Sequence, residues 1–95
     1  MPEPVKKFQW IITKDLLYDG DTIKENKIGF GNVKSADGLT YQFRLRDDDK
    51  ELYYEGLCNG WEFDGEQVFA PLDWAEWYAG ATVLEYLEDG TWKQL

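Results

Sequence analysis

The chain has 95 residues, of which 43% are apolar and 17% aromatic, and its formal net charge is −9. This length predicts one domain with a single core, and the aromatic content argues against a disordered acidic chain. The chain has no histidine and one cysteine, Cys58. That composition excludes an internal disulfide, a Ser-His-Asp arrangement and a zinc site built from thiolates or imidazoles.

The N-terminus predicts a flexible arm over residues 1–6, which contain two prolines, within a single domain spanning residues 1–95. The arm lacks the apolar stretch of a secretory signal. No apolar run in the chain approaches the roughly 18 residues that a membrane span needs. Together with the lone cysteine, these features predict a protein of the reducing cytoplasm.

The first half of the chain predicts one strand and several turns. Phe8, Trp10 and Ile12 alternate with residues 9, 11 and 13, which is typical of a strand. Residues 15–27 are polar and are expected to form a loop. Gly29 and Gly31 then indicate a weak strand or a bulge. Asp37-Gly38 predicts the two-residue turn of a hairpin.

The middle of the chain predicts a hairpin. Residues 41–46 alternate most clearly, Asp47-Asp48-Asp49-Lys50 interrupts the pattern, and residues 51–57 resume extended character. The acidic run is therefore expected at the tip of the hairpin. A turn-rich stretch follows, and Val68-Phe69 suggests a short strand.

The last third predicts a short helix and two more strands. Apolar residues at helical spacing favour a helix near 72–79, with Asp73 as its cap and Gly80 at its end. Residues 82–87 and 91–95 alternate again. The expected fold is mainly β: a single small antiparallel sheet, curled or closed into a barrel, of five to six strands with one short helix.

The charge is divided unevenly along the chain. Residues 1–46 carry eight Lys and Arg against six Asp and Glu, whereas residues 47–95 carry two against thirteen. The second half can fold only if its acids lie on solvated surface, where they project a negative field. Direct binding to nucleic acid or to an anionic membrane is therefore disfavoured, because both rest on clustered cations.

Two segments resemble fragments of ligand-binding loops. Gly29-Phe30-Gly31 matches part of a phosphate-binding glycine pattern, but Lys34 stands where a third glycine belongs, and a bulge or turn is favoured. The run from Asp47 to Glu51 is contiguous, whereas calcium loops space their ligands at alternate positions. A solvated turn is favoured there, with a divalent ion left open. We expect no metal site and no cofactor.

Enzymatic activity is not expected. Asp73 and Glu76 share a face if their segment is helical, as a pair of catalytic carboxylates would. A domain of this size seldom builds a cleft of adequate depth around such a pair. We therefore assign no catalytic residue.

Tryptophans beside acids add a second indication of a binding surface to the negative field. Trp61, Trp74 and Trp77 lie in turn-rich or helical segments next to acidic residues. Trp74 and Trp77, three residues apart, are expected to face the same way on a helical turn. They either plug the open end of the sheet or form an interface, since Trp dominates binding hot spots. Aromatic rings beside carboxylates suit a basic partner.

Several segments are similar to a known group of proteins. The chain resembles a group of small uncharacterised bacterial proteins that are often encoded on plasmids, phages or other mobile elements. The likeness spans most of the chain and implies a bacterial cytosolic setting and a mobile-element role, with no binding or catalytic residue transferred. The matching segments are 10–17, 43–56 and 69–73, with Tyr86 and Trp92.

We expect a small acidic protein-binding module that docks on a basic protein surface. In a narrower form, that surface normally holds DNA or RNA, and the module is a nucleic-acid mimic and inhibitor. Two alternatives stay open: a carbohydrate or small-ligand binder that uses exposed Trp and acids, and an assembly subunit whose strand edges pair. The expected partner-binding residues are Asp47, Asp48, Asp49, Glu51, Trp61, Glu62, Asp64, Asp73, Trp74, Glu76 and Trp77.

Overall fold

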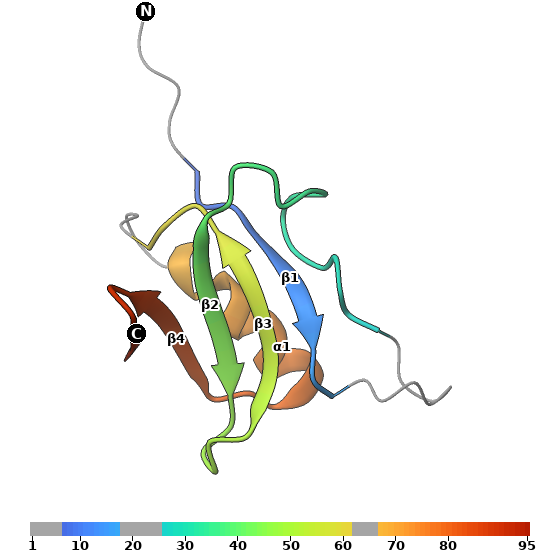
Figure 1. The fold of residues 1–95 in the computed structure, drawn as a ribbon. Helices are drawn as coiled ribbons and strands as arrows, with labels where there is room; N and C mark the ends of the chain where they lie inside the picture. The colour runs from blue at the N-terminus through green and yellow to red at the C-terminus, as the bar shows by residue number, and fades with distance from the viewer. Residues whose placement is uncertain (1–6, 18–25, 62–66) are drawn as a thin grey trace, which may run out of the picture.

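A single antiparallel sheet forms the body of the protein in a computed structural model, which describes residues 7–17, 26–61 and 67–95. The sheet has the order β1-β3-β2-β4-β5 and is not closed into a barrel (Figure 1). The structure confirms the mainly β fold and, of the two expected forms, a curled sheet or a barrel, it shows the sheet. The strands are β1 (Trp10–Asp15), β2 (Tyr41–Arg46), β3 (Leu52–Cys58), β4 (Val83–Glu88) and β5 (Thr91–Gln94).

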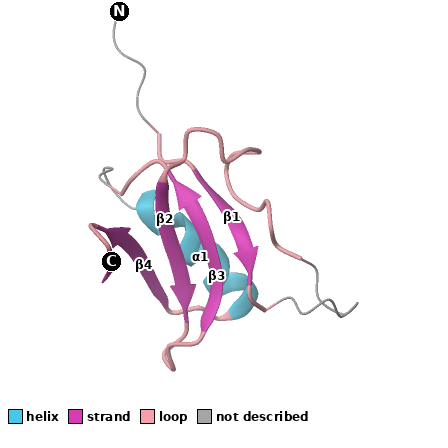
Figure 2. Ribbon diagram, in the orientation of Figure 1, coloured by secondary structure: helices cyan, strands magenta, loops and turns pink. Residues whose placement is uncertain are grey.

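One helix, α1 (Ala70–Ala79), covers one face of the sheet, which we call the covered face (Figure 2). Side chains at alternate positions of the strands point into the space beneath the helix, as strand geometry requires. The core is rich in rings: Trp10 lies 6.2 Å from Phe43, and Phe43 lies 6.2 Å from Tyr86, between ring centroids. The sheet residues buried in this core include Trp10, Ile12, Phe43, Leu45, Tyr54, Cys58, Leu84 and Tyr86.

The predicted hairpin of β2 and β3 is confirmed, with the acidic run at its tip. The two strands pair along their length, and the Asp47 N–H donates to the carbonyl of Glu51 at 3.1 Å to close the turn. Lys50 adopts a φ of 67°, in the left-handed region. A non-glycine residue reaches that region in tight turns, where the geometry of the turn offsets its cost.

The hairpin predicted at Asp37-Gly38 is wrong. The two residues form a turn, and Gly38 has a φ of 81°, but β2 pairs with β3 and β4 and not with the preceding segment. That segment lies instead along β1, where the Ile12 N–H donates to the carbonyl of Phe30 at 2.6 Å. The turn residues predict a change of direction, but they do not determine which strand becomes the neighbour.

The strand predicted at Val68-Phe69 is also wrong. These residues belong to a 3-10 helix, η1 (Gln67–Phe69), directly before α1. Val68 is buried, and its carbonyl accepts a hydrogen bond of 2.6 Å from the Tyr86 hydroxyl. Two apolar residues are too few to show a period, and here they enter the core from the start of a helix.

The helix predicted near residues 72–79 is confirmed, but its predicted cap is wrong. Phe69 is the N-cap residue and makes no capping side-chain bond, while Asp73 lies inside the first turn. Pro71 at the helix start accounts for the earlier boundary, because its fixed φ suits the first turn. Gly80 ends the helix with a φ of 74°, and its N–H donates to the carbonyl of Glu76 at 3.1 Å.

The two C-terminal strands are confirmed as a tight hairpin. Asp89 and Gly90 form its turn with φ values of 52° and 78°, both in the left-handed region. In the part of the chain that the structure describes, no helix is both long enough and apolar enough to cross a membrane.

Candidate functional site

The outer side of α1 carries the most exposed tryptophan of the described residues. Trp77 is 83% exposed, whereas Ala75 on the inner side of the helix is fully buried. Asp73 and Glu76 are exposed beside Trp77, at spacings of four residues and one residue. Together these three side chains line a shallow hollow of about 370 Å³. We call Asp73, Glu76 and Trp77 the helix surface.

The helix surface is electronegative without local compensation. α1 contains no Lys or Arg, and neither carboxylate has an ion-pair partner among the residues that the structure describes. The helix dipole adds partial negative charge at the C-terminal turn, where Glu76 and Trp77 lie. A cation over the Trp77 ring would therefore meet the negative face of the ring and two nearby carboxylates.

Trp74 lies apart from this surface, contrary to the expectation that it faces the same way as Trp77. Its ring is half-buried among three others, with centroid distances of 5.9 Å to Trp10, 5.5 Å to Phe30 and 4.9 Å to Tyr54. Trp74 therefore fixes α1 to the sheet, as the plugging interpretation has it.

Trp61 is half-buried at the end of β3 that is remote from the acidic tip. Its ring meets Tyr41 edge-on at 5.1 Å and lies 5.5 Å from Tyr86. It closes one end of the core and contributes less free surface than Trp77. The other two expected partner-binding residues of this stretch, Glu62 and Asp64, lie outside the described residues.

The first acids of the run at the hairpin tip serve the turn itself. Asp47 accepts hydrogen bonds of 2.9 Å from the backbone N–H groups of Asp49 and Glu51, and its other oxygen accepts one of 3.2 Å from the Tyr53 hydroxyl. Asp48 accepts a 2.6 Å bond from the Thr82 hydroxyl, which ties the tip to the start of β4. Within this run, the exposed carboxylates of Asp49 and Glu51 make no such bond to another described residue.

No metal centre is found at the tip or elsewhere in the described ranges. Within residues 7–17, 26–61 and 67–95, no three carboxylate, thiolate or imidazole side chains come together as metal ligands. The Asp47 carboxylate is occupied by backbone donors, which is the geometry of a solvated turn.

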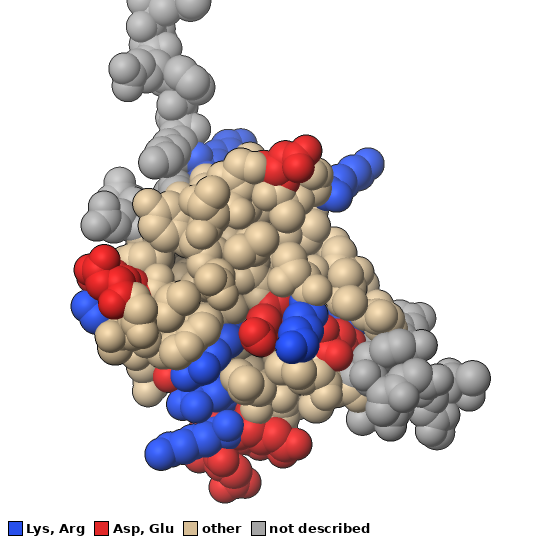
Figure 3. Space-filling model, in the orientation of Figure 1, with Lys and Arg blue, Asp and Glu red and all other residues tan. Residues whose placement is uncertain are grey.

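The acids of the opposite face of the sheet, which we call the open face, are interleaved with cations. Register sets Lys14 beside Glu55, Glu55 beside Arg44, and Arg44 beside Glu85, so that charges alternate across four strands. Figure 3 views the open face, and Lys and Arg alternate there with Asp and Glu. The acids of the second half of the chain therefore do not form one continuous surface on this side.

The centre of that row is a compact ion cluster. Arg44 donates from Nε to Glu85 Oε1 at 2.7 Å, and Arg46 Nε lies 2.9 Å from the same oxygen. The Arg44 guanidinium also lies 4.1 Å from the centroid of the Trp92 ring. Glu85 is only 7% exposed. Burying its negative charge costs free energy, which the two adjacent cations offset.

The sequence analysis did not predict the ion cluster, although the sequence indicates that its two arginines share a face. Alternation along residues 41–46 puts Arg44 and Arg46 on one face. Their acidic partner is 41 and 39 residues further on, and nothing local links the two segments.

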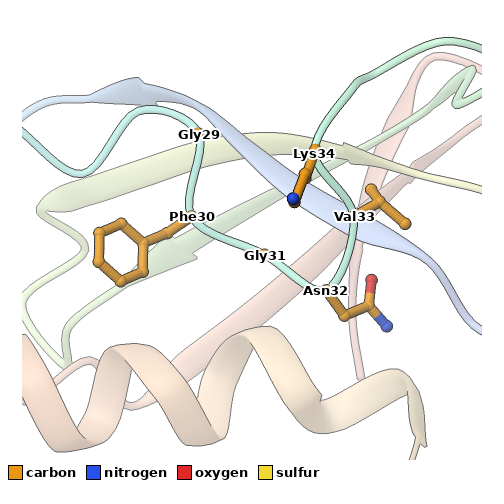
Figure 4. Close-up of a pocket in the computed structure, with 6 residues that line it drawn as sticks. All are labelled: Gly29, Phe30, Gly31, Asn32, Val33 and Lys34. Atoms are coloured by element: carbon orange, nitrogen blue, oxygen red, sulfur yellow. The ribbon is translucent and has the colours of Figure 1, made fainter.

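A second hollow, of about 380 Å³, lies along the loop of residues 29–34 (Figure 4). Asn32 is held on both sides, since its Oδ1 accepts from the Trp10 N–H at 2.8 Å and its Nδ2 donates to the Phe8 carbonyl at 2.7 Å. A side chain at Gly31 would collide with the backbone of Trp10. Gly31 therefore allows close approach to β1, and Gly29 lies in a turn with a φ of 96°, in line with the interpretation of a bulge or turn.

The lone cysteine is poorly placed for nucleophilic chemistry. Cys58 is fully buried, and burial raises the pKa of its thiol to about 11. The reactive thiolate is therefore scarce near neutral pH.

Comparison with known proteins adds no relative, because no family model, no curated protein and no solved structure matches the chain. The resemblance to small proteins of mobile elements stays a prediction. The function is therefore argued from the geometry described above.

Proposed function

We propose that this protein is a small acidic protein-binding module whose helix surface docks on an Arg- or Lys-rich surface of another protein. The observation that carries the proposal is Trp77, 83% exposed between two carboxylates that lack a described cation. Burying a large aromatic side chain contributes roughly 1.5–3 kcal/mol. Because the Trp77 ring is exposed to solvent, its burial by a partner would contribute that free energy to the complex.

The magnitudes set what the helix surface can contribute. A cation–π contact is worth about 0.5–1 kcal/mol at an exposed site and about 2 kcal/mol when desolvated. Each exposed ion pair adds up to about 1 kcal/mol. The helix surface therefore supplies selectivity for a cation at the centre of a wider interface, and the field of the net charge supplies attraction at a distance.

The narrower form of the proposal, a nucleic-acid mimic, needs acids arranged as a long row. The exposed acids that could contribute to it include Asp73 and Glu76 on the helix surface, Asp49 and Glu51 at the hairpin tip, and Asp89 in the turn between β4 and β5. Competition tests it: duplex DNA should release a captured partner if the module occupies a nucleic-acid site.

The same surface supports a second candidate, a carbohydrate or small-ligand binder. A sugar ring could stack on Trp77 while Asp73 and Glu76 accept its hydroxyl hydrogen bonds within the hollow. Neutral oligosaccharides separate the two candidates, because they offer no cation to the carboxylates.

The test of the proposal is a pair of charge-matched variants. A fluorescent nona-arginine peptide is titrated with the unsubstituted chain, with Asp73→Asn/Glu76→Gln and with Asp49→Asn/Glu51→Gln. Both double variants remove two negative charges, so they weaken the long-range field equally. We expect the helix-surface variant to lose about tenfold in affinity beyond the tip variant, in line with two lost ion pairs.

Trp77→Ala gives the second reading of the same titration. We expect it to weaken peptide binding about threefold to fivefold at unchanged net charge, as the loss of an exposed cation–π contact would. Equal losses in the two double variants, with no loss in Trp77→Ala, would mean that the peptide senses only net charge. Binding of neutral oligosaccharides but not of the peptide would select the second candidate.

A further inference from the structure

The open face of the sheet is the second surface of the molecule with unexplained composition. Four apolar side chains lie on it half-buried, although no described segment crosses in front of β2 and β3 (Figure 1). They alternate with the buried residues of the covered face, as Leu87 does with Tyr86. These side chains are Leu57, Val83, Leu87 and Trp92.

The open face is also where the charge of the protein is locally balanced. Lys14, Arg44 and Arg46 face Glu55 and Glu85 there, in a chain whose net charge is −9. A second copy approaching the helix surface or the hairpin tip meets like charge, which opposes association. A second copy approaching the open face meets balanced charge, with little repulsion, and the four apolar side chains.

The order of charges makes the open face complementary to itself. Across the strands the row reads Lys14, Glu55, Arg44, Glu85. A two-fold axis that runs along the strands between β3 and β2 sets Glu55 opposite Arg44 of a second copy, and Lys14 opposite Glu85 of that copy. An axis across the strands through this row would set each charge opposite itself, so of these two axes only the first brings opposite charges together.

We propose that two copies of this chain pack open face to open face about that axis, with the two α1 helices on the outside. Sheets packed face to face lie about 10 Å apart, and a two-fold contact uses the same residues on both sides. The arrangement does not depend on the proposed function. It leaves both helix surfaces free, so the dimer would present two of them on opposite sides.

The size of the face makes the association weak. Five strands spaced by about 4.8 Å, each about 20 Å long, give a face on the order of 400 Å². A standard stable interface buries about 800 Å² on each partner. We therefore expect a dimer that dissociates on dilution through the micromolar range.

Two measurements on the full chain test the proposal. Sedimentation equilibrium from micromolar to millimolar concentration should show a monomer and dimer in exchange. Amide resonances in nuclear magnetic resonance spectra should shift on dilution, with the largest shifts in the open-face positions of β2, β3 and β4 and smaller ones at Trp92 of β5. The second measurement needs no substitution, so it does not depend on whether a variant folds.

Matched variants locate the contact. Leu87→Glu on the open face should weaken dimerisation by at least about tenfold, because it buries a charge at the contact, while Trp77→Glu on the helix surface should leave it within about twofold. Leu87→Glu should still bind the nona-arginine peptide, which separates this proposal from the proposed function. A monomer at millimolar concentration, or dilution shifts confined to α1 or β5, would overturn it, as would a dimer that Trp77→Glu dissociates and Leu87→Glu does not.

Discussion

The covered face of the sheet is a cluster of aromatic rings, whereas the open face is a row of alternating charges. Beneath α1, Phe43 and Tyr86 are almost completely buried and touch other rings. On the other side, Arg44 and Glu85 meet at 2.7 Å. The same strands are thus stabilised by aromatic packing on the covered face and by ion pairs on the open face.

This difference changes what the net charge of a segment means. The second half of the chain has an excess of acids, but strand pairing brings Lys14, Arg44 and Arg46 from the first half to the acids of the open face. The acids of α1 receive no such cations among the described residues. Local compensation, and not the count of acids, distinguishes the surface that can attract a basic partner.

The largest expected effect is on the covered face, at Gly56. A side chain at this position of β3 would meet the carbonyl of Ile11 and the ring of Phe43. We expect Gly56→Ala to lower the free energy of unfolding by about 3 kcal/mol, as overpacking of a core does. Urea unfolding followed by circular dichroism measures it.

Gly38→Ala is the matched control for that prediction. Apart from the adjoining residues, no atom lies within 4 Å of the added carbon, and the φ of 81° makes the substitution cost about 1 kcal/mol from backbone strain alone. An equal loss in both variants would contradict the packing described around Gly56.

A substitution on the open face should lower stability less than Gly56→Ala does, and it should act through the loss of an ion pair. Glu85→Ala leaves Arg44 and Arg46 close together without the carboxylate between them. Because both guanidinium groups are partly exposed, we expect a loss of about 2 kcal/mol, below that of a fully buried pair. Glu76→Ala on α1 should change stability by less than about 0.5 kcal/mol, so similar losses in these two variants would remove the distinction between the surfaces.

A single hydrogen bond of the covered face gives a smaller effect. Tyr86→Phe removes the hydroxyl that donates to the Val68 carbonyl at 2.6 Å and joins the sheet to η1. The expected loss is about 1–1.5 kcal/mol, measured by thermal unfolding. Tyr41→Phe, at a tyrosine that is 45% exposed, should leave the midpoint unchanged.

A last effect is absent near neutral pH and appears only in alkaline solution. Burial on the covered face raises the pKa of Tyr54 from 10.0 to about 12, with a lesser contribution from Asp15. The unfolded chain therefore loses this proton at lower pH than the folded chain. The stability due to Tyr54 is complete below pH 10 and is lost as the pH rises toward 12. Unfolding by urea at increasing pH should show this decline, and Tyr54→Phe should reduce it.

The local sequence pattern predicted the positions of the strands and the helix better than it predicted which strands pair. The alternation of residues 41–46 and the stop at Gly80 depend on adjacent residues and are visible in the sequence. The strand order and the ion cluster depend on pairing between segments some 40 residues apart. No local rule specifies that pairing, so the hairpin at Asp37-Gly38 was wrongly expected.

The candidate site was predictable to a similar extent. Asp73, Glu76 and Trp77 were among the expected binding residues, because tryptophan beside acids suits a cationic partner. Trp74 was expected beside them, but three residues turn a helix by less than one full turn, and Trp74 falls on the inner side. The hairpin tip was expected as a binding element, although Asp47 and Asp48 there hold the turn.

The most direct measurement is a residue-resolved titration of the full chain with the nona-arginine peptide, followed by nuclear magnetic resonance. We expect the first and largest shifts at the amides of α1 around Asp73 and Glu76 and at the indole N–H of Trp77. Shifts that begin at residues 47–51, or that spread evenly over the exposed acids, would contradict the claim that the helix surface is the docking site.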